Sequence, residues 1–207
     1  MRTVNFYSFV IPRVVFMKKY FLSIPIILFP YTLLGALHCL YTGFLMESLF
    51  GNNGFLLLGA VVLCAAIAFL FSLLLGALAV AKKWNAKGMA LCNMIIKLCQ
   101  IPAYIAIFVL GVVFGISVLG LPFVAVFFLC DVAAIVTSGL VGASAAYVGF
   151  LEGKLLKSDA IIYALCQFIF CIDIIFCILL YVRIRKLPRV SADAYLTPDM
   201  SDKFSSS

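Results

Sequence analysis

The chain has 207 residues, of which 66% are hydrophobic and only 11% are charged, and its formal net charge is +7. Soluble domains have about half apolar and about a quarter charged residues, so this chain cannot cover a soluble fold with a polar surface. The basic residues lie between apolar runs, which is typical of loops at an anionic membrane surface and not of nucleic-acid binding. We therefore expect an all-α polytopic membrane protein, surrounded by membrane lipids and without a nucleic-acid partner.

The eight cysteines do not change this prediction. They form no C-x-x-C pair and have no tetrahedral metal spacing, and most lie in or beside apolar runs. In lipid a thiol behaves as a small hydrophobic group. We expect no metal ion and no cofactor.

The N-terminal segment, residues 1–19, is basic and too interrupted to cross a membrane, so we expect it at the interface. The apolar run over 20–46 is too long for the apolar region of a signal peptide, and it predicts a first, uncleaved span. Two prolines, Pro25 and Pro30, should kink it. His38, the only histidine, lies in this span and is a candidate for proton transfer or for a hydrogen-bonded packing role.

A turn-forming Asn-Asn-Gly precedes the second predicted span, 55–81. Every fourth residue over much of this span is small, a pattern typical of helices that approach each other closely. The residues are Ala60, Cys64, Ala68, Ser72 and Gly76.

Residues 82–100 carry four lysines and read as a basic loop that contains a short amphipathic juxtamembrane helix. Asn93, Lys97 and Gln100 share one face of that helix. The third span, 101–120, contains a second tight-contact pattern at Gly111 and Gly115.

A Gly-Leu-Pro turn leads into the fourth span, 123–149, where Asp131 is followed by a run of small residues that includes Gly139 and Gly142. The fifth predicted span, 160–182, contains Asp173 and ends in a basic cluster. The whole of 1–187 is expected to form one transmembrane domain, and 188–207 a disordered polar tail.

Lysine and arginine counts orient the chain with its N terminus in the cytoplasm of a multi-pass cell-membrane protein. With five spans, however, the basic cluster at 183–189 lies on the outer side, against the rule. Either the last segment crosses regardless, or it re-enters the membrane without crossing. We expect five full spans.

Asp131 and Asp173 are the main candidates for a functional site. An aspartate at mid-membrane costs about 2.5–3.5 kcal/mol on insertion scales, so two of them need an explanation. Asp131 is predicted about 14 Å from one membrane face and Asp173 about 21 Å from the other, which permits a shared site. The acids either join helices as neutral hydrogen-bonding groups or, with His38 nearby, bind a proton or cation. No basic residue is expected at their depth.

Enzymatic activity is not expected. The two acids lack the G-x-G-D context of intramembrane aspartyl proteases, and Ser138 and Ser144 lack a G-x-S-x-G context.

Three motifs carry a resemblance in the second half of the chain: N-M-I-I-K-L-C-Q-I-P-A-Y at 93–104, V-F-F-L-C-D at 126–131, and E-G-K-L-L-K-S-D-A-I-I-Y-A-L-C-Q-F-I-F-C-I-D at 152–173. In these the chain resembles a group of small membrane proteins from clostridia-like bacteria that have no established activity. The resemblance implies a bacterial membrane location and nothing about mechanism.

The first functional hypothesis is a protein that acts through helix–helix association, as an accessory or assembly partner of another membrane protein. The alternative is a small transporter or channel subunit with an intramembrane carboxylate site for a proton or cation. Five spans are few for a complete alternating-access carrier, so transport predicts a homo-oligomer, with small residues at 60–76 and 111–115 at the interface.

Overall fold

The computed structural model describes residues 6–116 and 120–186, with side chains from residue 21 onward. These residues form seven α-helices and no strand, so the prediction of an all-α bundle is confirmed. The helices are α1 (Phe6–Thr42), α2 (Phe44–Phe50), α3 (Gly54–Ala81), α4 (Ala86–Gly115), α5 (Leu121–Leu151), α6 (Lys157–Cys166) and α7 (Ile172–Lys186). The polar tail 188–207 and the start of the N-terminal segment lie outside the described residues.

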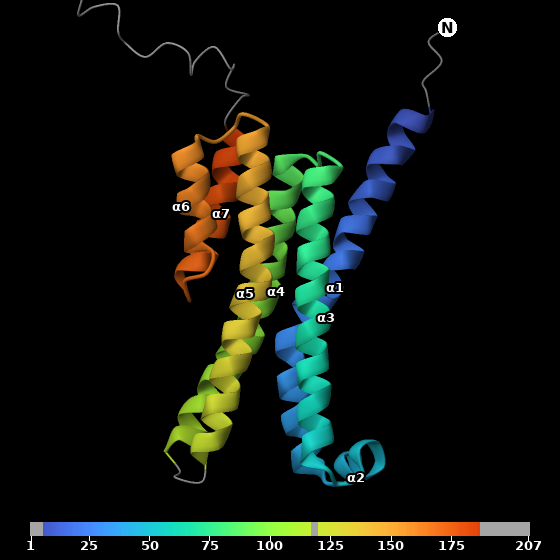
Figure 1. Ribbon diagram of the computed structural model, residues 1–207, viewed down its shortest axis with the longest axis vertical. Coiled ribbons are helices and arrows are strands. Elements are labelled where there is room, and N and C mark those ends of the chain that lie inside the picture. Colours follow the sequence, from blue (N-terminus) through green and yellow to red (C-terminus); the bar gives the residue numbers. More distant parts are fainter. Residues whose placement is uncertain (1–5, 117–119, 187–207) are drawn as a thin grey trace, which may run out of the picture.

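Four helices within the described residues are long and apolar enough to cross a membrane: Phe21–Thr42 of α1, and α3, α4 and α5. They alternate in direction, so the chain runs down and up through the bundle (Figure 1). The expected spans 55–81 and 123–149 agree with α3 and α5 to within two residues. The first span ends earlier than expected because Gly43, at a positive φ of 55°, separates α1 from the short helix α2.

The expected fifth span, 160–182, is wrong. The chain there forms two short helices, α6 and α7, separated by turns at residues 167–171. In Figure 1, α6 descends partway along the bundle and α7 returns to the end from which α6 started. An ion pair between Arg183 Nη2 of α7 and Asp159 Oδ2 of α6, 2.5 Å apart, joins the two helices at that end. We call this segment the re-entrant hairpin, because both of its ends lie at the same end of the bundle.

The hairpin removes the conflict in the charge pattern. The 82–85 and 152–156 connections and the C-terminal end of α7 all lie at one end of the bundle, which is also the end where α1 begins (Figure 1). We call it the basic end, because the lysines and arginines with described side chains outside the bundle interior gather there. They are Lys82, Lys83, Lys87, Lys154, Lys157, Arg183, Arg185 and Lys186. The connections at the opposite end, residues 43–53 and 116–120, contain no lysine or arginine.

The expected loop over residues 82–100 is also different. Only residues 82–85 connect α3 to α4, and α4 continues without a break from Ala86 to Gly115, through Pro102. The polar face expected at the membrane interface is instead buried inside the bundle, where Asn93, Lys97 and Gln100 are completely inaccessible. An amphipathic pattern shows that one helix face avoids lipid, but it does not distinguish an aqueous interface from a protein interior.

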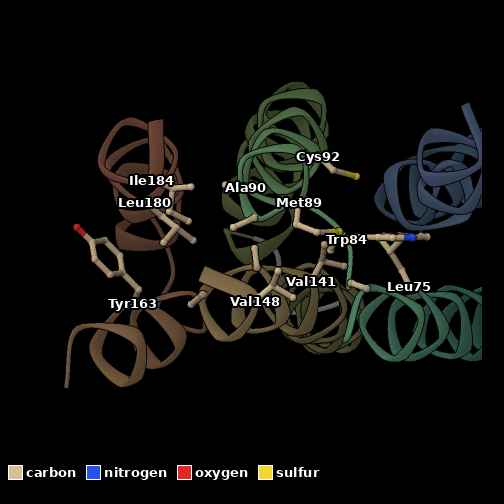
Figure 2. Packing of buried hydrophobic residues seen from close by; sticks show 14 of the residues in the cluster. Leu75, Trp84, Met89, Ala90, Cys92, Val141, Val148, Tyr163, Leu180 and Ile184 are labelled. Carbon is tan, nitrogen blue, oxygen red and sulfur yellow. The ribbon is translucent and has the colours of Figure 1, made fainter. Parts of the chain in front are cut away.

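The largest hydrophobic cluster occupies the half of the bundle toward the basic end. Leu180 and Ile184 of α7 point toward α4 and α5, where Ala90 and Val148 belong to the same cluster (Figure 2). The hairpin therefore packs as part of the core.

The small-residue faces pack within the chain. Ala68, Ser72 and Gly76 of α3 are buried, while Ala60 and Cys64 are partly buried. A Cβ atom at Gly76 would collide with the Ser144 side chain of α5. Gly111 and Gly115 of α4 lie close to Phe127 and Val124 of α5.

Candidate intramembrane polar site

One face of α4 carries a row of polar side chains through the middle of the bundle. Asn93, Lys97, Gln100 and Tyr104 are spaced by four, three and four residues, which places them on one stripe of a helix. The first three are fully buried, and Tyr104 is 8% exposed. Lys97 lies 11 residues from the start of α4, about 16 Å along the helix axis and thus near mid-membrane.

Lys97 is the centre of this row. Its Nζ atom lies 2.5 Å from Asp173 Oδ2 of α7, 3.1 Å from Ser138 Oγ of α5 and 3.2 Å from the Gln167 carbonyl oxygen. A lysine ammonium group has three donors, and each finds an acceptor here. The ammonium group thus holds α4, α5 and the hairpin together.

The expectation that no basic residue lies at the depth of the aspartates is wrong. Lys97 belongs to α4 and not to a loop, and it pairs with Asp173, whose side chain is 4% exposed. A buried pair of opposite charges removes most of the penalty that either charge alone would suffer. Asp173 is therefore held by Lys97, and a direct partnership with Asp131 is not needed to explain it.

The turn of the hairpin fits into a notch on α5 made by two glycines. A Cβ atom at Gly142 would lie 2.5 Å from Gln167 Oε1, and one at Gly139 would lie 2.8 Å from the Phe168 ring. Cys171, at a positive φ of 63°, closes the turn before α7 begins. The two expected packing glycines therefore lie against the re-entrant turn.

Beside the turn, two buried amides have unused hydrogen-bonding capacity. Asn93 Nδ2 donates to Gln167 Oε1 at 3.2 Å, and both side chains are fully buried. Asn93 Oδ1 and Gln167 Nε2 have no hydrogen-bond partner among the described residues. Each unsatisfied buried polar atom lowers the stability by roughly 1–3 kcal/mol. A small polar molecule that hydrogen-bonds to these two atoms would therefore bind favourably here.

The row continues toward the opposite end through Gln100 and Tyr104. Gln100 Nε2 donates to the Ile26 carbonyl oxygen of α1 at 2.8 Å, and the Tyr104 hydroxyl donates to Gln100 Oε1 at 3.2 Å. The first bond connects the row to α1, and the second joins two members of the row.

Asp131 lies at the far end of this polar row. It is partly buried on α5, and its Oδ1 atom is buried without a hydrogen-bond partner among the described residues. Ala134, three residues after Asp131 on α5, packs in one buried cluster with Tyr104, so Asp131 follows Tyr104 toward the opposite end of the bundle. Asp131 is not neutralised by an ion pair within the described part of the chain.

His38 does not join this site. It is exposed on α1, close to the opposite end of the bundle, and its carbonyl oxygen accepts a hydrogen bond from Thr42. No hydrogen bond or ion pair within the described part of the chain joins its side chain to Asp131 or Asp173. Within the described ranges, no three His, Cys, Asp or Glu side chains lie close enough together to hold a metal ion.

An apolar pocket of about 290 Å³ lies beneath the hairpin turn, on the side toward the opposite end. Tyr104, Phe108, Phe170 and Asp173 are among its lining residues. The pocket exists because the hairpin turns back and leaves the lower part of α4 and α5 uncovered. Because Asp173 lines this pocket, the Lys97–Asp173 ion pair lies one side chain away from the surface of the bundle.

Comparisons with protein-family models, with curated proteins and with solved structures found no match to this chain. The resemblance in the second half of the chain consequently rests on its three motifs alone and stays a prediction. The four membrane-spanning helices and the polar site are the observations from which a function can be argued.

Proposed function

We propose that this integral membrane protein conducts protons or small monovalent cations, with Asp131 as the group that binds them and the re-entrant hairpin as the element that controls access. The observation that carries the proposal is the unpaired, buried Oδ1 of Asp131 at the end of a polar row that begins near the basic end. Ionisable groups and broken helices at mid-membrane are typical of ion and proton pathways. The proposed activity is not enzymatic.

The charges of the site favour a positive species. Lys97 and Asp173 neutralise each other, so Asp131 is the remaining formal charge in the row and makes the site acidic overall. An uncompensated carboxylate in a low-dielectric interior binds a proton or a cation and repels anions. Asp131 would accept a proton from one side of the membrane and release it to the other.

We also propose that the basic end faces the cytoplasm of a cell membrane, which places the N terminus there as well. The eight lysines and arginines with described side chains at this end, and the absence of these residue types from the opposite connections, support this orientation. The Asn93–Gln167 amides then lie on the cytoplasmic side of the ion pair, and Asp131 on the outer side.

Association with a second copy or another membrane protein, the first hypothesis from the sequence, has less support. The small-residue faces that suggested it, at 60–76 and 111–115, pack largely against helices of the same chain. A homo-oligomer would have to use other surfaces.

The test uses the full-length protein in vesicles that contain a pH-sensitive dye, with a potassium gradient and valinomycin to set the membrane potential. We expect proton flux from the wild type and its loss in Asp131→Asn, because asparagine keeps the shape of the side chain but cannot bind and release a proton. Glu47→Gln is the matched control, since Glu47 is an exposed acid on α2 outside the bundle interior.

Two results would contradict the proposal. One is a wild type that conducts no protons in this assay and, in vesicles without valinomycin, no sodium or potassium above protein-free vesicles. The other is a folded Asp131→Asn variant with wild-type flux. Thermal unfolding of each variant distinguishes a folded protein that no longer conducts from a protein that no longer folds.

A further inference from the structure

The pocket at the basic end between α3 and α5 is a second candidate binding site. It has a volume of about 550 Å³ and is lined by the ends of both helices and the 82–85 connection. Its walls are apolar, from Ala79, Val80, Val148 and Leu151, and its charged groups are Lys83 and Glu152. A site at a membrane surface with an apolar wall and a charged rim fits a lipid, because the acyl chains can contact the wall and the headgroup can contact the rim.

The acidic side chain in this pocket is already neutralised. Glu152 Oε1 accepts a hydrogen bond from the Ala86 amide at 2.7 Å, at the N-terminus of α4, and Glu152 Oε2 pairs with Lys154 Nζ at 2.7 Å. Lys83 is exposed and has no ion pair within the described part of the chain. The unneutralised charge in the pocket is therefore positive.

The backbone at Lys83 provides an independent argument. The Lys83 amide donates to the Val80 carbonyl and the Trp84 amide donates to the Ala79 carbonyl, which is the hydrogen-bond pattern of a Schellman helix end. Lys83 occupies its left-handed position with φ of 47°, where glycine is strongly preferred.

The same motif ends α5, and there the left-handed residue is Gly153, with φ of 68°. The chain thus uses glycine at one of two neighbouring helix ends and a strained lysine at the other. A positive charge near a helix C-terminus is favourable, but Lys82 already supplies one in the preceding position, without the strain. The strained conformation places the Lys83 side chain at the pocket.

We propose that this pocket binds the phosphate headgroup of an anionic phospholipid, with Lys83 as the phosphate contact and the apolar wall against the lipid chains. The inner leaflet of a cell membrane is rich in anionic lipid, and the basic end is the one proposed to face it. The site is separate from the polar row and does not depend on proton or cation conduction.

The test measures lipid retained by the purified full-length protein in native mass spectrometry, with phosphatidylglycerol and phosphatidylcholine as the two probes. We expect the wild type to prefer phosphatidylglycerol. Lys83→Gly should lower its affinity for that lipid about fivefold, from about 1 kcal/mol for one basic residue near an anionic group. The same variant should unfold at an equal or higher temperature, because glycine relieves the left-handed strain.

Two controls separate the pocket from the general charge of this end. Lys82→Gln removes a neighbouring exposed charge that does not line the pocket, and it should change the lipid preference less than Lys83→Gly does. Leu151→Trp should fill the pocket mouth and lower the affinity without changing any charge. Equal loss in both lysine variants, or retention of phosphatidylglycerol by Lys83→Gly at the wild-type level, would overturn the proposal. Competition by inorganic phosphate alone, at equal affinity, would assign the site to a free anion.

Discussion

Removal of the Lys97 charge should release the re-entrant hairpin from the bundle. Lys97→Met keeps the length of the side chain but leaves the Asp173 carboxylate buried without its partner, and it removes the donors to Ser138 and to the Gln167 carbonyl. Removal of one member of a buried ion pair costs about 3–5 kcal/mol. Docking of the hairpin should weaken by a corresponding factor of roughly 10² to 10³·⁷.

Hydrogen-exchange mass spectrometry measures this weakening locally. Peptides that cover 157–186 should exchange faster in Lys97→Met, while peptides from α3 serve as the internal reference. The double variant Lys97→Met with Asp173→Leu removes both charges and should recover much of the protection, because replacing both members of a buried pair is often neutral or stabilising. If the double variant exchanges as fast as the single one, the ion pair is not what holds the hairpin.

Three further results are expected. Gly142→Ala should destabilise the docked hairpin by about 1–3 kcal/mol, since its Cβ would overlap the side chain at the turn. Gly59→Ala, with nothing within 4 Å, should be neutral or slightly stabilising in the same thermal unfolding assay. Arg183→Gln should cost no more than about 1 kcal/mol, because the ion pair that it breaks is partly exposed; Arg185→Gln, at an exposed position, should cost less in the same denaturant titration. A reporter fused after Lys186 should give the same sidedness as one inserted at the 82–85 connection, and opposite signals would restore a fifth crossing.

The spans were predictable because a long apolar run in a membrane protein has few alternatives to a membrane-spanning helix. Runs of more than 20 apolar residues with turn residues between them determine α3 and α5 almost to the residue. The break at residues 167–171 was not predictable in the same way. Its sequence, Q-F-I-F-C, contains neither glycine nor proline, and the turn depends on partners from other helices.

The ion pair was missed for a related reason. A lysine usually ends an apolar run, so the sequence pattern groups Lys97 with the loop charges instead of with the span that follows it. Tyr104 extends the spacing of Asn93, Lys97 and Gln100, and this continuity was the available signal that α4 begins before them. The basic cluster after Asp173 was the second signal, because it conflicted with five crossings.

The contacts of Lys97 explain why the last segment turns back although its 27 residues, at 1.5 Å each, span about 40 Å and could cross a bilayer. A break in a helix at mid-membrane frees backbone carbonyls, and lipid offers them no donor. Lys97 Nζ supplies a donor to the freed Gln167 carbonyl, and Asp173 then compensates the charge that this donor brings. The lysine and the aspartate are therefore required together. A lysine alone would be a buried charge, and an aspartate alone would leave the broken backbone unsatisfied.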